Sequence, residues 1–343
     1  MSIIRRRIVP ATAIAGALML LATGCVAGEN SDSGPAEPAG DWSSNKVTVD
    51  WATYNPLSLI IRDQGILEEI VGDSVTVEWV QSAGSNKANE LLRAGSIDVG
   101  STAGSAAFLA RANGSPIKVI NIYSQPEWAA IVVPEDSEIT SLEQLAGTSV
   151  AATKGTDPYF FLLQALELGG LTVNDIEVQN LQHADGRTAL EGGDVDAWSG
   201  LDPIMAAAEV ESGARLLYRN VDFNTYGFLN ATEDFINNHP DLAQAVVDAY
   251  EQAREWALAN PEETAALLAE VAGIDIAVAT TVIEERSNLN VSGIPGAAQI
   301  AVLEKILPVL LADGDVQEGQ KALDDALASI VHAEFAERAV NGR

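Results

Sequence analysis

Four short segments place polar residues, glycine or proline where a predicted strand gives way to a predicted helix. They are Asn55-Pro56, Asp157-Pro158, Asp202-Pro203 and Gly100–Gly104, the last reading Gly-Ser-Thr-Ala-Gly. Asn or Asp at a helix N-cap accepts from free backbone N–H groups, and proline at the first helical position sacrifices no hydrogen bond. Helix N-termini present bare N–H groups and partial positive charge, so they can bind an anion. Capping alone explains any one junction, but four in one chain favour a ligand cleft.

Strand and helix patterns alternate on both sides of these junctions. Apolar and polar residues alternate at 46–51 and 74–79, which predicts two half-buried strands, and Pro56 to Ile70 between them has helical spacing. The alternation continues to about residue 233, and helices are predicted after it at 240–258, 261–272, 276–288, 297–312 and 316–337. Alternating strands and helices form mostly parallel sheets with helices on both faces. In such sheets ligands bind at the carboxyl ends of strands, where the junctions lie.

The α/β alternation runs through the chain twice, which predicts two lobes. We expect residues 46–125 to form the first part of lobe 1 and residues 126–222 to form lobe 2. Residues 223–343 are expected to return to lobe 1 and to end in helices. The length of 343 residues agrees with this division, because one hydrophobic core rarely organises so long a chain.

The composition argues against several classes of function. There are 19 Lys and Arg against 49 Asp and Glu, a formal net charge of −30, whereas a nucleic-acid binder needs a basic face. A single cysteine argues against a disulfide framework or a thiolate metal cluster. His183, His239 and His332 lie far apart without the spacing of metal ligands. We therefore expect no metal and no cofactor.

The N-terminus has the pattern of an export signal. Three arginines precede an apolar run that contains Pro10 and is too short to span a bilayer, and small residues lead to Cys25. Residues 1–24 are thus predicted to be a signal peptide. Small residues before a cysteine resemble the bacterial lipobox, which implies lipidation of Cys25; the alternative is a plain secretory signal with an incidental cysteine. Residues 25–45, rich in Gly, Ser, Pro and acids, are expected to be a flexible linker.

Three sequence blocks carry a family resemblance. They are Leu92–Thr102 (Leu-Arg-Ala-Gly-Ser-Ile-Asp-Val-Gly-Ser-Thr), Lys154–Thr156 before a helix, and Gly193–Trp198 followed by Asp202-Pro203. Together they resemble periplasmic aliphatic sulfonate-binding proteins, over a span from about residue 47 to about residue 331. That family comprises solute-binding proteins of ABC importers for sulfonates, taurine, nitrate and related anions. It implies a two-lobed periplasmic-binding-protein type II fold that closes around its ligand by hinge motion.

The resemblance also implies ligand contacts on both lobes. It matches Ser101 and Thr102 to donors for a sulfonate, Lys154, Gly155 and Thr156 to the loop of the opposite lobe, and Trp198 to an aromatic along the cleft, with Asp202 nearby. The family also contacts ligand after the first strand, where Asn55 lies. Each candidate has an ordinary structural alternative.

Three further positions lie at strand ends or at the crossing between lobes. Ser82 begins a donor-rich loop after the second strand, and its alternative is a loop with an N-cap. Gln125 lies at the expected crossing between lobes. His183 either contacts ligand or caps the helix after it, and capping is the simpler interpretation.

The chain departs from the family pattern at Asp157, where sulfonate binders more often have a second serine. A carboxylate at that N-cap would compete with an anionic ligand for the same N–H groups. Asp157 would instead suit a ligand with an ammonium group, as Asp202 would. The alternative is a helix cap that points away from the cleft.

The sequence as a whole predicts an extracytoplasmic solute-binding lipoprotein that delivers a small organosulfonate to an ABC permease and its ATPase. We expect a monomer held at the membrane of a Gram-positive cell by its lipid. Taurine, nitrate, another small anion or a thiamine-type pyrimidine are alternative ligands, and a sensor or an enzyme on the same fold are alternative roles. An enzyme is not favoured, because the chain lacks both the cysteine-rich motif of thiamine-pyrimidine synthases and a Gly-x-Ser-x-Gly elbow.

The lipid anchor can be tested directly. Replacing Cys25→Ser removes the thiol that would carry the lipid, so the protein should be released into the medium while its ligand binding is unchanged. Fractionation of cells into membrane and medium measures the effect. Retention of the variant at the membrane would contradict lipidation of Cys25.

Overall fold

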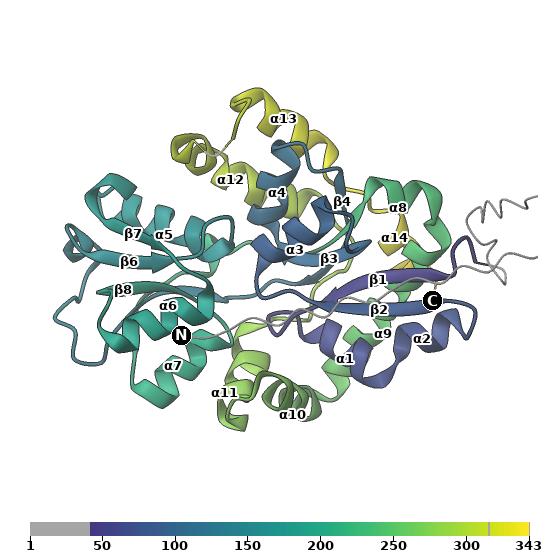
Figure 1. Cartoon of the computed structure of the whole chain (residues 1–343), viewed down its shortest axis with the longest axis horizontal. Helices are drawn as coiled ribbons and strands as arrows, with labels where there is room; N and C mark the ends of the chain where they lie inside the picture. Colours follow the sequence, from purple (N-terminus) through teal and green to yellow (C-terminus); the bar gives the residue numbers. More distant parts are fainter. Residues whose placement is uncertain (1–41, 315, 343) are drawn as a thin grey trace, which may run out of the picture. The chain divides into compact units, whose positions relative to one another are not determined.

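The computed structural model describes residues 42–314 and 316–342, so the predicted signal peptide and Cys25 lie outside the described residues. Within these residues the chain forms two five-stranded sheets surrounded by helices (Figure 1). The first sheet contains, in spatial order, β2 (Thr76–Gln81), β1 (Lys46–Trp51), β3 (Val99–Ala103), β10 (Gly227–Thr232) and β4 (Ile117–Ser124). The second contains β7 (Glu177–Asn180), β6 (Ser149–Ala152), β8 (Ala197–Leu201), β5 (Ala129–Val133) and β9 (Arg215–Arg219).

The two sheets have the same construction. In the first, β1 pairs in parallel with β2 and β3, and β10 runs antiparallel between β3 and β4. In the second, β6 pairs in parallel with β7 and β8, and β5 runs antiparallel between β8 and β9. In each sheet the antiparallel strand follows directly on the other sheet along the chain. This topology confirms the predicted two-lobed α/β fold; below, lobe 1 and lobe 2 mean the first and second sheet with their helices.

Helices connect the strands within each lobe and follow the last strand. Seven lie before β9: α1 (Pro56–Gln64), α2 (Ile66–Val71), α3 (Ser85–Arg93), α4 (Gly104–Ala112), α5 (Asp157–Leu168), α6 (His183–Gly192) and α7 (Ile204–Ser212). The others follow β10: α8 (Glu233–Asn238), α9 (Pro240–Ala259), α10 (Pro261–Ala272), α11 (Ile276–Thr280), which continues into a π-helical turn (Thr281–Arg286), α12 (Ala297–Asp313), α13 (Gln320–Ser329) and α14 (Glu334–Asn341). Short 3-10 turns span Leu142–Leu145, Val173–Asp175 and Val221–Phe223.

Two stretches predicted as single helices are each divided. The helical spacing from 56 to 70 is interrupted at Gly65, whose φ of 65° is left-handed and ends α1. The predicted helix at 316–337 is two helices, because the chain between α13 and α14 pairs with the edge strand β4. There the N–H of Val119 donates to the carbonyl of Ile330, and the N–H of His332 donates to the carbonyl of Val119.

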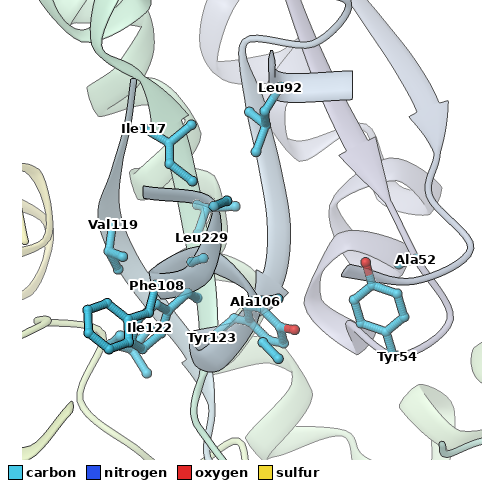
Figure 2. Packing of buried hydrophobic residues seen from close by; sticks show 14 of the residues in the cluster. Ala52, Tyr54, Leu92, Ala106, Phe108, Ile117, Val119, Ile122, Tyr123 and Leu229 are labelled. Atoms are coloured by element: carbon cyan, nitrogen blue, oxygen red, sulfur yellow. The ribbon is translucent and has the colours of Figure 1, made fainter. Parts of the chain in front are cut away.

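The main hydrophobic core runs through both lobes. It is built from alternate residues of the strands and from the inner faces of the covering helices. Figure 2 shows its part in lobe 1, where Phe108 and Ala106 of α4 gather with Ile117, Val119 and Ile122 of β4 and with Leu229 of β10. A smaller cluster joins α7 of lobe 2 to α1, α10 and α11, and α11 lies between α7 and α10 in Figure 1.

Among the described helices none combines the length and the apolar character needed to cross a bilayer.

Candidate functional site

A buried carboxylate organises the ends of the first three strands. Asp50, on β1, accepts hydrogen bonds from the hydroxyl of Ser82 (2.6 Å), from the N–H of Ser101 (2.8 Å) and from the hydroxyl of Ser101 (3.1 Å to either oxygen). The phenol of Tyr54 donates to the carbonyl of Ser101 at 2.9 Å. Burial raises the pKa of Asp50 to about 7, although the hydrogen bonds from Ser82 and Ser101 oppose the rise. The hydroxyls of Ser82 and Ser101 therefore donate to Asp50 and are not available to a ligand.

Asn55 and Thr102 also have partners inside the protein. The amide of Asn55 donates to the phenol of Tyr250 (3.0 Å) and its oxygen caps α1 by accepting from the N–H of Ser58. The hydroxyl of Thr102 donates to the carbonyl of Ala103 and accepts from the amide of Asn230, both at 2.9 Å. Both side chains are 0% exposed and bond to other parts of lobe 1.

Trp198 and Asp202 of lobe 2 are both buried. Trp198 is 1% exposed. A Cβ on Gly186 of α6 would lie 2.7 Å from its indole nitrogen, so the ring lies inside lobe 2 between the sheet and α6. Asp202 caps α7 by accepting from the N–H of Ala206 (2.9 Å) and pairs with Arg286 at 3.3 Å. Burial raises the pKa of Asp202 to about 6, against the opposing charge of Arg286.

Gln125, Asp202 and Arg286 lie near the crossing between the lobes. The backbone N–H of Gln125 donates to the carbonyl of Asn288 (3.1 Å). A pocket beside this crossing, lined in part by Tyr54, Asp202 and Arg286, has only about 10 Å³ of free volume, which is room for a single water. This pocket is too small for an organic anion.

Asp157 does not cap α5, contrary to the expectation from the sequence. It is the first residue of the helix, and its carboxylate accepts from the hydroxyl of Ser105 (2.5 Å), the indole of Trp128 (2.8 Å), and both the N–H and the hydroxyl of Thr225 (2.7 and 2.8 Å). Ser105 belongs to α4 of lobe 1, so this carboxylate joins the lobes. Burial raises the pKa of Asp157, and the four donors counteract part of that rise. A carboxylate with this many partners has little capacity left for a ligand ammonium.

Three helix N-termini from the two lobes meet near one another. A Cβ on Gly84, which precedes α3 in lobe 1, would lie 3.0 Å from Nε2 of His183, the first residue of α6 in lobe 2. A Cβ on Gly155, just before α5, would lie 3.9 Å from the Cβ of Asn86 in the first turn of α3. We call residues 84–86, 155–157 and 182–183 the interlobe site.

All three helices begin without a side-chain cap. No side chain of the N-cap residues Gly84, Thr156 and Gln182 bonds to the helix that follows. The hydroxyl of Thr156 instead donates back to the carbonyl of Thr153 at 2.6 Å. Uncapped N-termini leave backbone N–H groups available, and their dipoles favour an anion.

Several buried polar atoms at the interlobe site have no hydrogen-bond partner among the described residues. They are Oδ1 of Asn86, Oε1 of Gln182 and Nε2 of His183. His183 is 1% exposed, and burial lowers its pKa to about 4, so its ring is neutral at pH 7. An unpaired polar atom in such a position costs about 1–3 kcal/mol, which a ligand that pairs with it would recover.

The interlobe site contains some of the residues expected from the sequence and adds others. Gly155 and Thr156 belong to it, and the positive φ of Gly155 (75°) gives the loop a turn that suits glycine. Lys154 is exposed beside it, with its ammonium 5.2 Å from the ring centre of Tyr159. The sequence favours helix capping for His183 and does not single out Asn86. The signal in the sequence was position, since each lies in the first turn of a helix that follows a strand and a short loop.

No group of His, Cys, Asp and Glu side chains in the described part of the chain has the arrangement of a metal site.

Comparisons with known proteins give a consistent result. The model of the NMT1/THI5 like family matches residues 73–264. A putative aliphatic sulfonates-binding protein of Escherichia coli (strain K12) is 30% identical over 249 residues, which cover 72% of this chain and 77% of that protein.

Solved structures of proteins with similar names have the same fold. The crystal structure of the periplasmic aliphatic sulphonate binding protein SsuA from Escherichia coli superposes with a TM-score of 0.68 at 25% identity, covering 85% of this chain and 92% of that one. The alkanesulfonate-binding protein SsuA from Xanthomonas axonopodis pv. citri, bound to MOPS, gives a TM-score of 0.71 at 24% identity, covering 86% and 98%.

The raised pKa of Asp50 predicts a pH dependence of stability. The folded state holds this proton up to about pH 7, whereas the unfolded chain releases it near the ordinary pKa of an aspartate, 3.8. The folded state therefore binds more protons between these values, and the free energy of unfolding should fall as pH rises from about 4 to 7 and level off above. Asp157 and Asp202 shift in the same direction, so Asp50→Asn should reduce the slope without abolishing it. Urea unfolding across this range measures it, and equal slopes in the two proteins would contradict the assignment.

Proposed function

This chain belongs to the NMT1/THI5-like family, together with its aliphatic sulfonate-binding relatives, and we propose that it captures a small organosulfonate between its two lobes. The observation that carries the proposal is the convergence of three uncapped helix N-termini at the interlobe site. A sulfonate offers three oxygens that share one negative charge. Backbone N–H groups from α3, α5 and α6 would hold those oxygens without a charged side chain.

The net charge of −30 does not oppose an anionic ligand at this site. Exposed charges are screened over about 8 Å at physiological ionic strength. Fixed N–H dipoles act at hydrogen-bonding distance, where screening by salt is weak. Lys154, exposed beside the site, supplies a local positive charge at its entrance.

Contacts between the lobes support binding by closure. Asp157 of lobe 2 accepts from Ser105 of lobe 1, and Asp202 of lobe 2 pairs with Arg286, which also pairs with Glu209 of α7 at 2.7 Å. The chain segments that cross between the lobes supply Trp128 and Thr225, two further donors to Asp157. A hinge in these crossing segments would let the lobes separate, admit the ligand and close on it.

The proposed role in the cell is delivery of the ligand to an importer. A solute-binding protein works with a permease and its ATPase and works outside the cytoplasm. We propose that lipidated Cys25 and the linker 25–45 hold the folded part at the cell membrane as a monomer. The proposed division of the folded part is 46–125 and 223–343 for lobe 1 with the C-terminal helices, and 126–222 for lobe 2. A binding role is favoured over catalysis because the sequence holds no cysteine beyond Cys25 and no nucleophile elbow.

Gly84→Ala tests the site. The added Cβ would lie 2.9 Å from Oδ1 of Asn86 and 3.0 Å from Nε2 of His183, so it obstructs the approach of the lobes at the ligand. Affinity for ethanesulfonate should fall at least tenfold by calorimetry, while the melting temperature of the ligand-free protein changes little. Gly296→Ala is the matched control, since a Cβ there meets nothing within 4 Å.

A thermal-shift panel on the wild-type protein tests the class of ligand. A ligand at 100 times its Kd adds about 2.7 kcal/mol of stability, which a thermal-shift panel detects. If nitrate or a pyrimidine stabilises the wild type and alkanesulfonates do not, the proposed ligand class is wrong.

A further inference from the structure

His183 presents an unpaired nitrogen across the boundary between the lobes. Its ring lies at the start of α6 in lobe 2, and Nε2 points to the loop of lobe 1 at Gly84. Oδ1 of Asn86 approaches the same point from α3. The two atoms lie 3.0 and 2.9 Å from the position of a Cβ on Gly84, so they are at most 5.9 Å apart. An ammonium group has enough hydrogens to bond to both, whereas a hydroxyl has one hydrogen and bonds to one of them.

The hydrogen bonds around His183 determine its tautomer. The hydroxyl of Thr153 donates its one hydrogen to the carbonyl of Leu181 at 2.6 Å, because a carbonyl can only accept. The same oxygen lies 3.2 Å from Nδ1 of His183, and with its hydrogen already used it must accept there. Nδ1 thus carries the proton of the neutral ring, and Nε2 is left as an acceptor.

The buried carboxylates Asp157 and Asp202 are not available to play this part. Asp157 accepts from Ser105, Trp128 and Thr225, and Asp202 pairs with Arg286 and caps α7. The unpaired acceptors at the site are therefore the neutral atoms of Asn86, Gln182 and His183. A simple alkanesulfonate carries no donor and would leave all three unpaired.

We propose that the site selects a sulfonate that also carries a hydrogen-bond donor: a hydroxyl, which donates its one hydrogen to Nε2 of His183, or an ammonium group, which donates to Nε2 of His183 and Oδ1 of Asn86. This inference rests on the proposed function, since the sulfonate itself would occupy the N–H groups of the helix N-termini. Thr153 acts as a positioning residue, because it holds His183 in the tautomer that accepts.

The test is calorimetric titration of the full-length protein with ethanesulfonate, 2-hydroxyethanesulfonate and taurine. Wild type should bind one of the two donor-bearing ligands at least fivefold more tightly than ethanesulfonate, which is the effect of pairing one buried acceptor. The donor-bearing ligand that binds more tightly identifies the group as hydroxyl or ammonium. His183→Phe removes the acceptor and should abolish the preference, whereas His332→Phe, on the chain segment beside β4, should retain it.

Thr153→Val provides a second variant of nearly unchanged size. It removes the acceptor at Nδ1, so the proton of His183 can move to Nε2 and the preference should fall. The ¹⁵N chemical shifts of the His183 ring should report the change of tautomer, which loss of packing alone would not produce.

The outcomes separate the two proposals. If ethanesulfonate binds wild type as tightly as both other ligands, the selection proposed here is wrong while the sulfonate function stands. A preference that survives in both His183→Phe and Thr153→Val also overturns it. If none of the three sulfonates binds, the proposed function itself fails.

Discussion

The need to satisfy backbone N–H groups at buried helix N-termini governs this structure. Each βα junction exposes such groups at the carboxyl end of a strand, and closure of two lobes buries them. The protein satisfies some with side chains, as Asn55 does at α1 and Asp202 at α7. It leaves α3, α5 and α6 uncapped where the lobes meet. The candidate site is therefore the place where backbone N–H groups of three helices are left without a capping side chain.

Buried carboxylates hold the surroundings of that site in place. Asp50 ties Ser82 of the loop after β2 to Ser101 of β3, which fixes the segment leading to α3. Asp157 ties the start of α5 to α4 and to the crossing segments. Both are buried, and burial raises the pKa of both. Only the second of these carboxylates bonds to both lobes, through Ser105 of α4, so Asp157 is the one that restricts how the lobes can approach.

The fold could be predicted from the sequence because it depends on local periodicity. Alternation at 46–51 and helical spacing after Pro56 indicate their elements without knowledge of the rest of the chain. The division of the predicted 316–337 helix could not be foreseen, because it depends on pairing of 330–332 with β4, some 210 residues earlier.

The site could be predicted only as far as the loops that form it. The hydroxyls of Ser101 and Ser82 are of a type that can bind an anion, but both donate to Asp50. Asp50 lies 51 residues from Ser101 and 32 residues from Ser82 in the sequence, so this pairing was not visible there. The pattern around Trp198 implies a cleft aromatic, yet strand alternation turns that side chain toward α6. From the sequence, His183 can be interpreted as a helix cap. In the structure, the hydrogen bonds of Thr153 to Leu181 and to His183 make Nε2 the acceptor nitrogen of the ring, and Nε2 has no partner among the described residues.

The central claim is that uncapped N-termini of α3, α5 and α6 bind the anionic group. A crystal structure of the full-length protein with ethanesulfonate tests it most directly. We predict sulfonate oxygens about 3 Å from backbone nitrogens of residues 84–86, 155–157 and 182–183, with Ser101 and Ser82 still bonded to Asp50. A sulfonate bound instead by the hydroxyls of Ser101 and Thr102, or beside Arg286 at the crossing, would contradict the account.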